Sequence, residues 1–104
     1  MSSFVINVPD SVTVRSVAEF GGQLSTAFDS HADVVLDLAA LAELDLSFVQ
    51  LVHAARSHRD NAGGTLRLAR PANEAVAALL GRAGFLTDPD PADVDFWFHG
   101  DLPQ

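Results

Sequence analysis

The stretch Val34-Val35-Leu36-Asp37-Leu38-Ala39-Ala40-Leu41-Ala42-Glu43-Leu44-Asp45-Leu46-Ser47-Phe48-Val49 decides the fold of this 104-residue chain. Its first five residues form a short β-branched, apolar run, typical of a central strand that is covered on both faces. After a connection over residues 39–44, a helix is expected from Ser47 to Asn61, because Phe48, Leu51, Val52 and Ala55 are spaced at i, i+3, i+4 and i+7. This stretch predicts a strand, a loop and a helix.

Outward from this centre, strands and helices alternate. A helix with Ser16 as its N-cap and Glu19 in a capping box is expected before the central strand, and Gly63-Gly64 should end the following helix. Residues 65–69 then predict a strand, and Pro71-Ala72-Asn73 leads into a third helix that stops near Gly84. This order implies β-α-β crossovers and a partly parallel sheet.

The two ends of the chain are expected to add further strands. Residues 4–8 and 12–14 flank Pro9-Asp10-Ser11 and predict a β-hairpin. Residues 95–99 are rich in aromatic side chains and predict a last strand at the sheet edge, with a loose tip after Gly100. We expect one α/β domain over residues 1–104, with its core at about 4–98, a mixed sheet of about four to five strands and helices mainly on one face.

Composition narrows the classes of function. Six basic residues against 14 acidic ones give a formal charge of −8, which disfavours nucleic acid as a partner. Cysteine is absent, so disulfides and thiol chemistry are excluded. No apolar stretch is long enough for a signal peptide or a membrane span, so we expect a cytoplasmic protein without membrane insertion.

Catalytic and metal chemistry have little support. His53 and His58 are five residues apart and diverge on a helix, and the acidic run from Asp88 to Asp95 lacks the Gly and Glu of a calcium loop, so that a solvated loop is expected there. No combination of acid, base and nucleophile can be argued from the spacing. We therefore expect no cofactor, no metal and no enzymatic activity. A small-ligand sensor built on the same fold is an alternative, because the cleft beside the carboxyl end of a strand is a common binding site.

The central stretch resembles the signature of STAS domains, the family of the bacterial anti-sigma-factor antagonists. In that family an apolar strand leads through a loop to an Asp followed by Ser-Ser-Gly-Leu at a helix start, and Asp37 and Asp45 match its two acidic or amide positions. The resemblance extends over about residues 4–98 and implies partner switching. An antagonist binds an anti-sigma kinase, and phosphorylation of the Ser or Thr after the motif Asp releases it.

This sequence departs from the motif at the phosphorylated position. Leu46 stands where the acceptor hydroxyl is expected, Ser47 matches the second Ser, and Phe48 replaces the Gly. The resemblance thus implies an anti-sigma-factor-antagonist-like adaptor without the usual phospho-switch. The alternative is a constitutive subunit, similar to the STAS partner of lipid-transport ABC ATPases.

The same loop is the candidate site on physical grounds, because a helix N-terminus presents unpaired N–H groups to an anionic or hydrogen-bonding group. Capping by Asp45 or Ser47 is the first interpretation, and phosphorylation of Ser47 is the second. Phe48 fits the inward stripe, which leaves Leu46 as the better apolar contact. The expected partner contacts are Glu43, Asp45, Leu46, Ser47 and Gln50.

Overall fold

A computed structural model describes residues 4–100 of the chain, the side chains of residues 60 and 61 excepted. The element order is β1 (Phe4–Asn7), β2 (Ser11–Val12), α1 (Val17–Ser30), β3 (Asp33–Asp37), β4 (Glu43–Leu44), α2 (Leu46–Asn61), β5 (Thr65–Leu68), α3 (Glu74–Arg82) and α4 (Pro91–Phe98). The predicted α/β class is confirmed, with the strands divided between a three-stranded and a two-stranded sheet.

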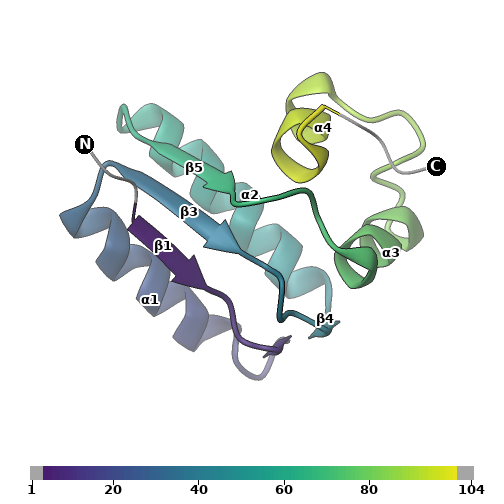
Figure 1. The fold of residues 1–104 in the computed structure, drawn as a ribbon, viewed down its shortest axis with the longest axis horizontal. Helices are drawn as coiled ribbons and strands as arrows, with labels where there is room; N and C mark the ends of the chain where they lie inside the picture. Colours follow the sequence, from purple (N-terminus) through teal and green to yellow (C-terminus); the bar gives the residue numbers. More distant parts are fainter. Residues whose placement is uncertain (1–3, 101–104) are drawn as a thin grey trace.

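The main sheet has the order β1-β3-β5, and both of its strand pairs are parallel. Figure 1 shows the three arrows side by side and pointing the same way, with α1 and α2 behind them. Val34, for example, pairs with Phe4 on one side and with Leu66 on the other. The strand predicted from the central stretch is therefore the middle strand of the sheet.

The core lies between this sheet and its helices. Alternate strand residues such as Ile6, Leu36 and Leu68 are buried there, because side chains at i and i+2 of a strand share a face. Phe48 of α2 is fully buried, and its ring lies 5.7 Å from Phe20 of α1. The inward position predicted for Phe48 is confirmed.

The predicted N-terminal hairpin is wrong. β1 pairs parallel with β3, and β2 pairs parallel with β4, so the chain continues alongside the β3–β4 segment instead of reversing at residues 9–11. The carbonyl of Asp10 accepts hydrogen bonds from the backbone N–H groups of Ala42 and Glu43, both at 2.9 Å. These long-range bonds fix the path of the Pro-Asp-Ser segment beside the start of β4, where local turn chemistry alone favoured a reversal.

The predicted C-terminal strand is also wrong, because residues 91–98 form α4. Asp90 caps this helix by accepting a hydrogen bond from Ala92 N at 2.8 Å, and Pro91 occupies its first turn, where the missing N–H costs nothing. Phe96, Trp97 and Phe98 are buried. Aromatic content therefore reflected burial and not strand geometry; the predicted loose tip after Gly100 lies outside the described residues.

The remaining predicted boundaries agree closely, with one local exception. Gly63 and Gly84 both have positive φ, 83° and 86°, just beyond the ends of α2 and α3, as predicted for helix stops. Ser16 does precede α1, but its side chain makes no capping bond to the helix and instead accepts from Thr13 N at 3.2 Å. The capping box with Glu19 is therefore not formed.

Candidate functional site

Asp45 closes the start of α2. Its Oδ1 accepts a hydrogen bond from the backbone N–H of Ser47 at 3.0 Å and also from the Ser47 hydroxyl. Its Oδ2 accepts from the backbone N–H of Val14 at 2.9 Å. Asp45 therefore satisfies one of the free N–H groups of the helix and ties the turn after β2 to the helix start.

These three donors also set the charge of the Asp45 carboxyl group. The Ser47 hydroxyl, followed by the Val14 N–H, stabilises the carboxylate and lowers its pKa from the usual value, while partial burial opposes this to a smaller extent. Asp45 is thus an anion held in place by structural bonds. Its role as the helix cap is the one the geometry supports.

Ser47 is half-buried, and its hydroxyl donates to the Asp45 carboxylate. A phosphate on Ser47 would remove this hydrogen bond and place about −1.5 to −2 charges next to the Asp45 anion. Phosphorylation would therefore act on the cap of α2 as well as on anything bound to it.

Two apolar side chains stand exposed beside this cap. Val14 is 72% exposed, and its backbone N–H donates to Asp45. Leu46 is 41% exposed and follows Asp45 directly in the sequence. Gln50 is exposed one helical turn after Leu46, and exposed Glu43 accepts a hydrogen bond from Ser11 Oγ at 2.7 Å. We call Val14, Glu43, Leu46 and Gln50 the helix-start surface.

The structure brings the sequence-predicted residues together but divides their roles. Glu43, Leu46 and Gln50 face solvent, whereas Asp45 and Ser47 are half-buried and bonded to each other. Val14 was missed as a site residue. In the sequence Val14 belongs to the run 12–14 that predicts a hairpin strand, and nothing in that run indicates a contact residue.

The loop that leads to this surface is held from the other side by Asn73. Its Nδ2 donates to the carbonyl oxygens of Leu38 at 2.9 Å and Leu41 at 2.8 Å, while its Oδ1 accepts from Val76 N at 3.0 Å. One half-buried amide thus caps α3 and fixes the β3–β4 loop. The sequence placed Asn73 before a helix but gave no sign of the two long-range bonds.

Asp37, the first acidic position of the motif, has a local role. Its Oδ1 accepts from the backbone N–H of Ala39 at 2.9 Å, and its Oδ2 lies 3.9 Å from Nη2 of Arg70. The carboxylate therefore turns the chain at the end of β3. It does not reach the helix-start surface through any of these bonds.

The other candidate chemistries are not assembled in the described part of the chain. Among the side chains that the structure describes, no group of three His, Asp or Glu could hold a metal ion. The acidic run is not simply a solvated loop as expected, since Asp90 caps α4 and Asp93 lies 2.8 Å from Arg56. Within the same residues, no helix is long and apolar enough to cross a membrane.

Comparison with protein families gives the class of the domain. The family model described as "Mlab, STAS domain" matches residues 2–87, which include every strand and the helices α1 to α3. The chain belongs to the STAS domain family. Among curated proteins, no relative matches the chain.

Membership of this family sets a coarse expectation of function. STAS domains are generally non-enzymatic regulatory domains and commonly interact with proteins. The resemblance stated from the central stretch is therefore confirmed at the level of the family. α4 lies beyond the matched residues.

Proposed function

We propose that this domain is a non-enzymatic, anti-sigma-factor-antagonist-like adaptor that binds a serine kinase or anti-sigma factor through its helix-start surface. The observation that carries the proposal is the exposed Leu46 at the position where the family motif has its acceptor hydroxyl. A leucine at this position cannot be phosphorylated. The contact is therefore expected to form without the usual phospho-switch.

The chemistry of the surface supports a protein partner. Leu46 and Val14 offer apolar contact area, and Glu43 and Gln50 offer polar groups around it, which is the common layout of an interface with an apolar centre and a polar rim. A basic rim on the partner would complement the formal charge of −8 on this chain and speed association. The expected partner surface is an apolar pocket with basic residues around it.

A second candidate is a constitutive subunit of an ABC lipid-transport ATPase complex. The observation that favours it is the state of Ser47, the nearest hydroxyl, which is half-buried and donates to Asp45. Leu46 has no hydroxyl, and the Ser47 hydroxyl is engaged in the cap of α2, so neither residue offers a free hydroxyl for phosphorylation. A permanent contact would need none.

Capture of the tagged protein from its native cell, followed by mass spectrometry, separates the two candidates. A serine kinase or anti-sigma factor that cross-links to Leu46 or Gln50 supports the adaptor, and an ATPase at fixed stoichiometry supports the subunit. A partner that cross-links only to residues outside the helix-start surface contradicts both. Phosphate on Ser47 in molecules of this protein that are not bound to the partner would contradict the absence of a phospho-switch.

The variant Ser47→Asp tests the switch directly. A carboxylate at this position would lie beside the Asp45 anion and lack the hydroxyl donor, so it should weaken the α2 cap and the complex together. Ser47→Ala removes the same hydrogen bond without the added charge and is the matched control. If the two variants bind the partner equally, charge at position 47 has no regulatory effect.

A further inference from the structure

The strand β1 forms an open edge of the main sheet. Among the residues that the structure describes, it pairs with β3 on one side only, since the sheet order is β1-β3-β5. The Val8 N–H donates to the carbonyl of Asp37 at 3.0 Å, so Val8, Ile6 and Phe4 direct their backbone groups toward β3. Because these directions alternate along a strand, Val5 and Asn7 direct their N–H and C=O groups away from the sheet.

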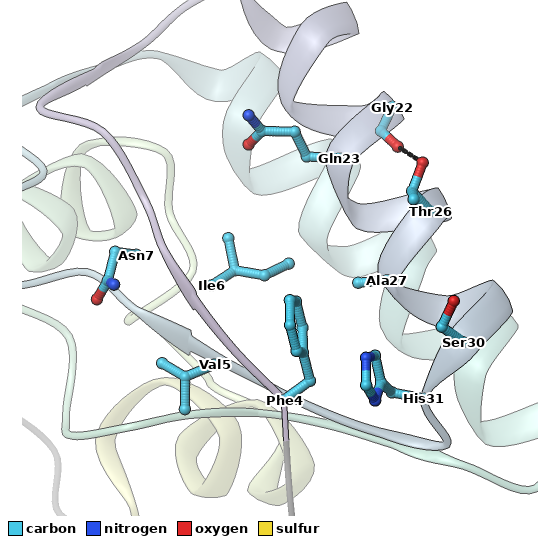
Figure 2. A pocket seen from close by; sticks show the side chains of 10 residues that line it. All are labelled: Phe4, Val5, Ile6, Asn7, Gly22, Gln23, Thr26, Ala27, Ser30 and His31. Carbon is cyan, nitrogen blue, oxygen red and sulfur yellow. Dashed lines mark hydrogen bonds between the residues drawn. The ribbon is translucent and has the colours of Figure 1, made fainter.

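A groove of about 680 Å³ lies along this edge, between β1 and α1. Figure 2 shows Phe4 and Ile6 on the strand side and Gln23 and Ala27 on the helix side. At one end the Phe4 ring stacks on His31, with 4.3 Å between centroids and an angle of 7° between the planes. Phe4 is nevertheless 40% exposed, and Val5, on the opposite face of the strand, is 49% exposed.

The groove carries no Asp, Glu, Lys or Arg side chain among the residues that line it, although the chain has a formal charge of −8. β1 itself contains no charged residue, no proline and no bulge, which are the features that normally protect an exposed edge from pairing. An uncharged edge with apolar side chains on both faces is suited to strand addition. Two highly acidic chains could approach here without bringing carboxylates into contact.

We propose that β1 pairs with β1 of a second copy of this chain, antiparallel and across a two-fold axis at Ile6. In this register Val5 lies opposite Asn7 of the second copy, and Asn7 lies opposite Val5 of the second copy. The backbone N–H and C=O groups that these residues direct away from β3 then face each other. Each of these two residue pairs exchanges two N–H···O=C hydrogen bonds. The two three-stranded sheets thereby join into a single six-stranded sheet. The two-fold closes the assembly at a dimer, because both open β1 edges are consumed.

The groove gives this dimer its second contact. Phe4 and Ile6 of the second copy would extend the apolar row on the α1 side, while Val5 of each copy would continue the opposite face of the sheet. The inference does not depend on the proposed function, because the β1 edge and the helix-start surface share no residue.

Two variants test the pairing, and one control matches them. Asn7→Pro removes an outward N–H that makes no bond to β3, so it should abolish the dimer and leave the folded monomer intact. Gln23→Glu adds one negative charge to the groove wall of each copy without changing the size of the side chain, and should weaken dimerisation about tenfold. Ser57→Glu adds one negative charge to an exposed position of α2 that belongs to neither the groove nor the helix-start surface, and should leave dimerisation unaffected.

The measurement is light scattering during size-exclusion chromatography, with circular dichroism to verify the fold. The wild-type protein should elute with twice the chain mass of 11.0 kDa, and its Val5 amide should exchange slowly with deuterium only at concentrations where the dimer forms. A wild-type monomer at millimolar concentration overturns the proposal, and so does a dimer that Asn7→Pro and Gln23→Glu leave unchanged. Val5 protection in the monomer overturns it too, since the chain itself would then cover the edge.

Discussion

The side chain of Asn73 offers the sharpest test of how the site is held in place. Replacing it with alanine removes two hydrogen bonds to the carbonyl oxygens of Leu38 and Leu41, as well as the cap bond from Val76 N. With a net value of about 1 kcal/mol for each bond, Asn73→Ala should lower the free energy of unfolding by about 3 kcal/mol. This is a large share of the stability of a small domain.

The variant Asn73→Asp separates the cap from the two loop bonds. The carboxylate keeps the acceptor for Val76 N but presents an anionic oxygen to two carbonyl oxygens, so its pKa should be raised in the folded state. Stability relative to the wild type should therefore be greatest below about pH 4, where the acid is protonated in both states, and should fall as the pH rises above that value. At pH 7 the loss should be at least about 2 kcal/mol.

The assay is urea unfolding followed by the fluorescence of Trp97, the single tryptophan of the chain, which is 3% exposed in the folded protein. Gln50→Glu is the matched amide-to-acid control at an exposed position and should change stability by less than about 0.5 kcal/mol. An Asn73→Asp protein as stable as the wild type at pH 7 would refute the claim that the two Nδ2 bonds hold the loop.

Three further predictions concern the rest of the fold. The lowered pKa of Asp45 stabilises the fold above about pH 4, and this contribution is lost as the pH falls through the lowered pKa, so Asp45→Asn should flatten the acid side of a stability–pH profile from urea unfolding. Arg56→Ala breaks the 2.8 Å contact with Asp93 and should cost about 1 kcal/mol; equal urea midpoints for variant and wild type would contradict this. Gly64→Ala would press a methyl group against the carbonyl oxygen of Ala32 and should lower stability by about 2 kcal/mol in thermal unfolding, whereas an unchanged midpoint would show that the backbone there yields freely.

The sequence predicted the centre of the fold well because its signals there are mutually consistent. The β-branched run became the middle strand, and the apolar spacing after it placed Phe48 in the core. Gly63 took the positive φ that a helix stop requires. In each case local preference and tertiary packing favour the same structure.

The two ends of the chain were mispredicted because in each case one local sequence signal was used and a second, opposing influence on the structure was left out. The residues at 9–11 resemble a turn, but hydrogen bonds from Ala42 and Glu43 keep the segment parallel to a distant part of the chain. The aromatic run at 96–98 resembles a strand, but Asp90 and Pro91 are a helix start, and that signal was in the sequence.

The candidate site was predictable in position but not in detail. The motif identified Asp45, Leu46 and Ser47, and spacing along a helix added Gln50. Val14 could not be found in this way, because it reaches the site through a backbone hydrogen bond to a residue 31 positions away. This contact depends on the pairing of β2 with β4, and each of these strands has only two residues, too few for an apolar pattern to specify their pairing.

The central claim is that Leu46 contacts the partner, and the affinity of the captured partner for Leu46→Gln tests it most directly. Leu46 is 41% exposed, and burying this apolar side chain should contribute enough that its loss weakens binding about tenfold. Val5→Gln, at a residue 49% exposed on β1, is the matched control and should bind as the wild type does. Equal affinities for Leu46→Gln and wild type, or a loss confined to Val5→Gln, would contradict the assignment of the helix-start surface.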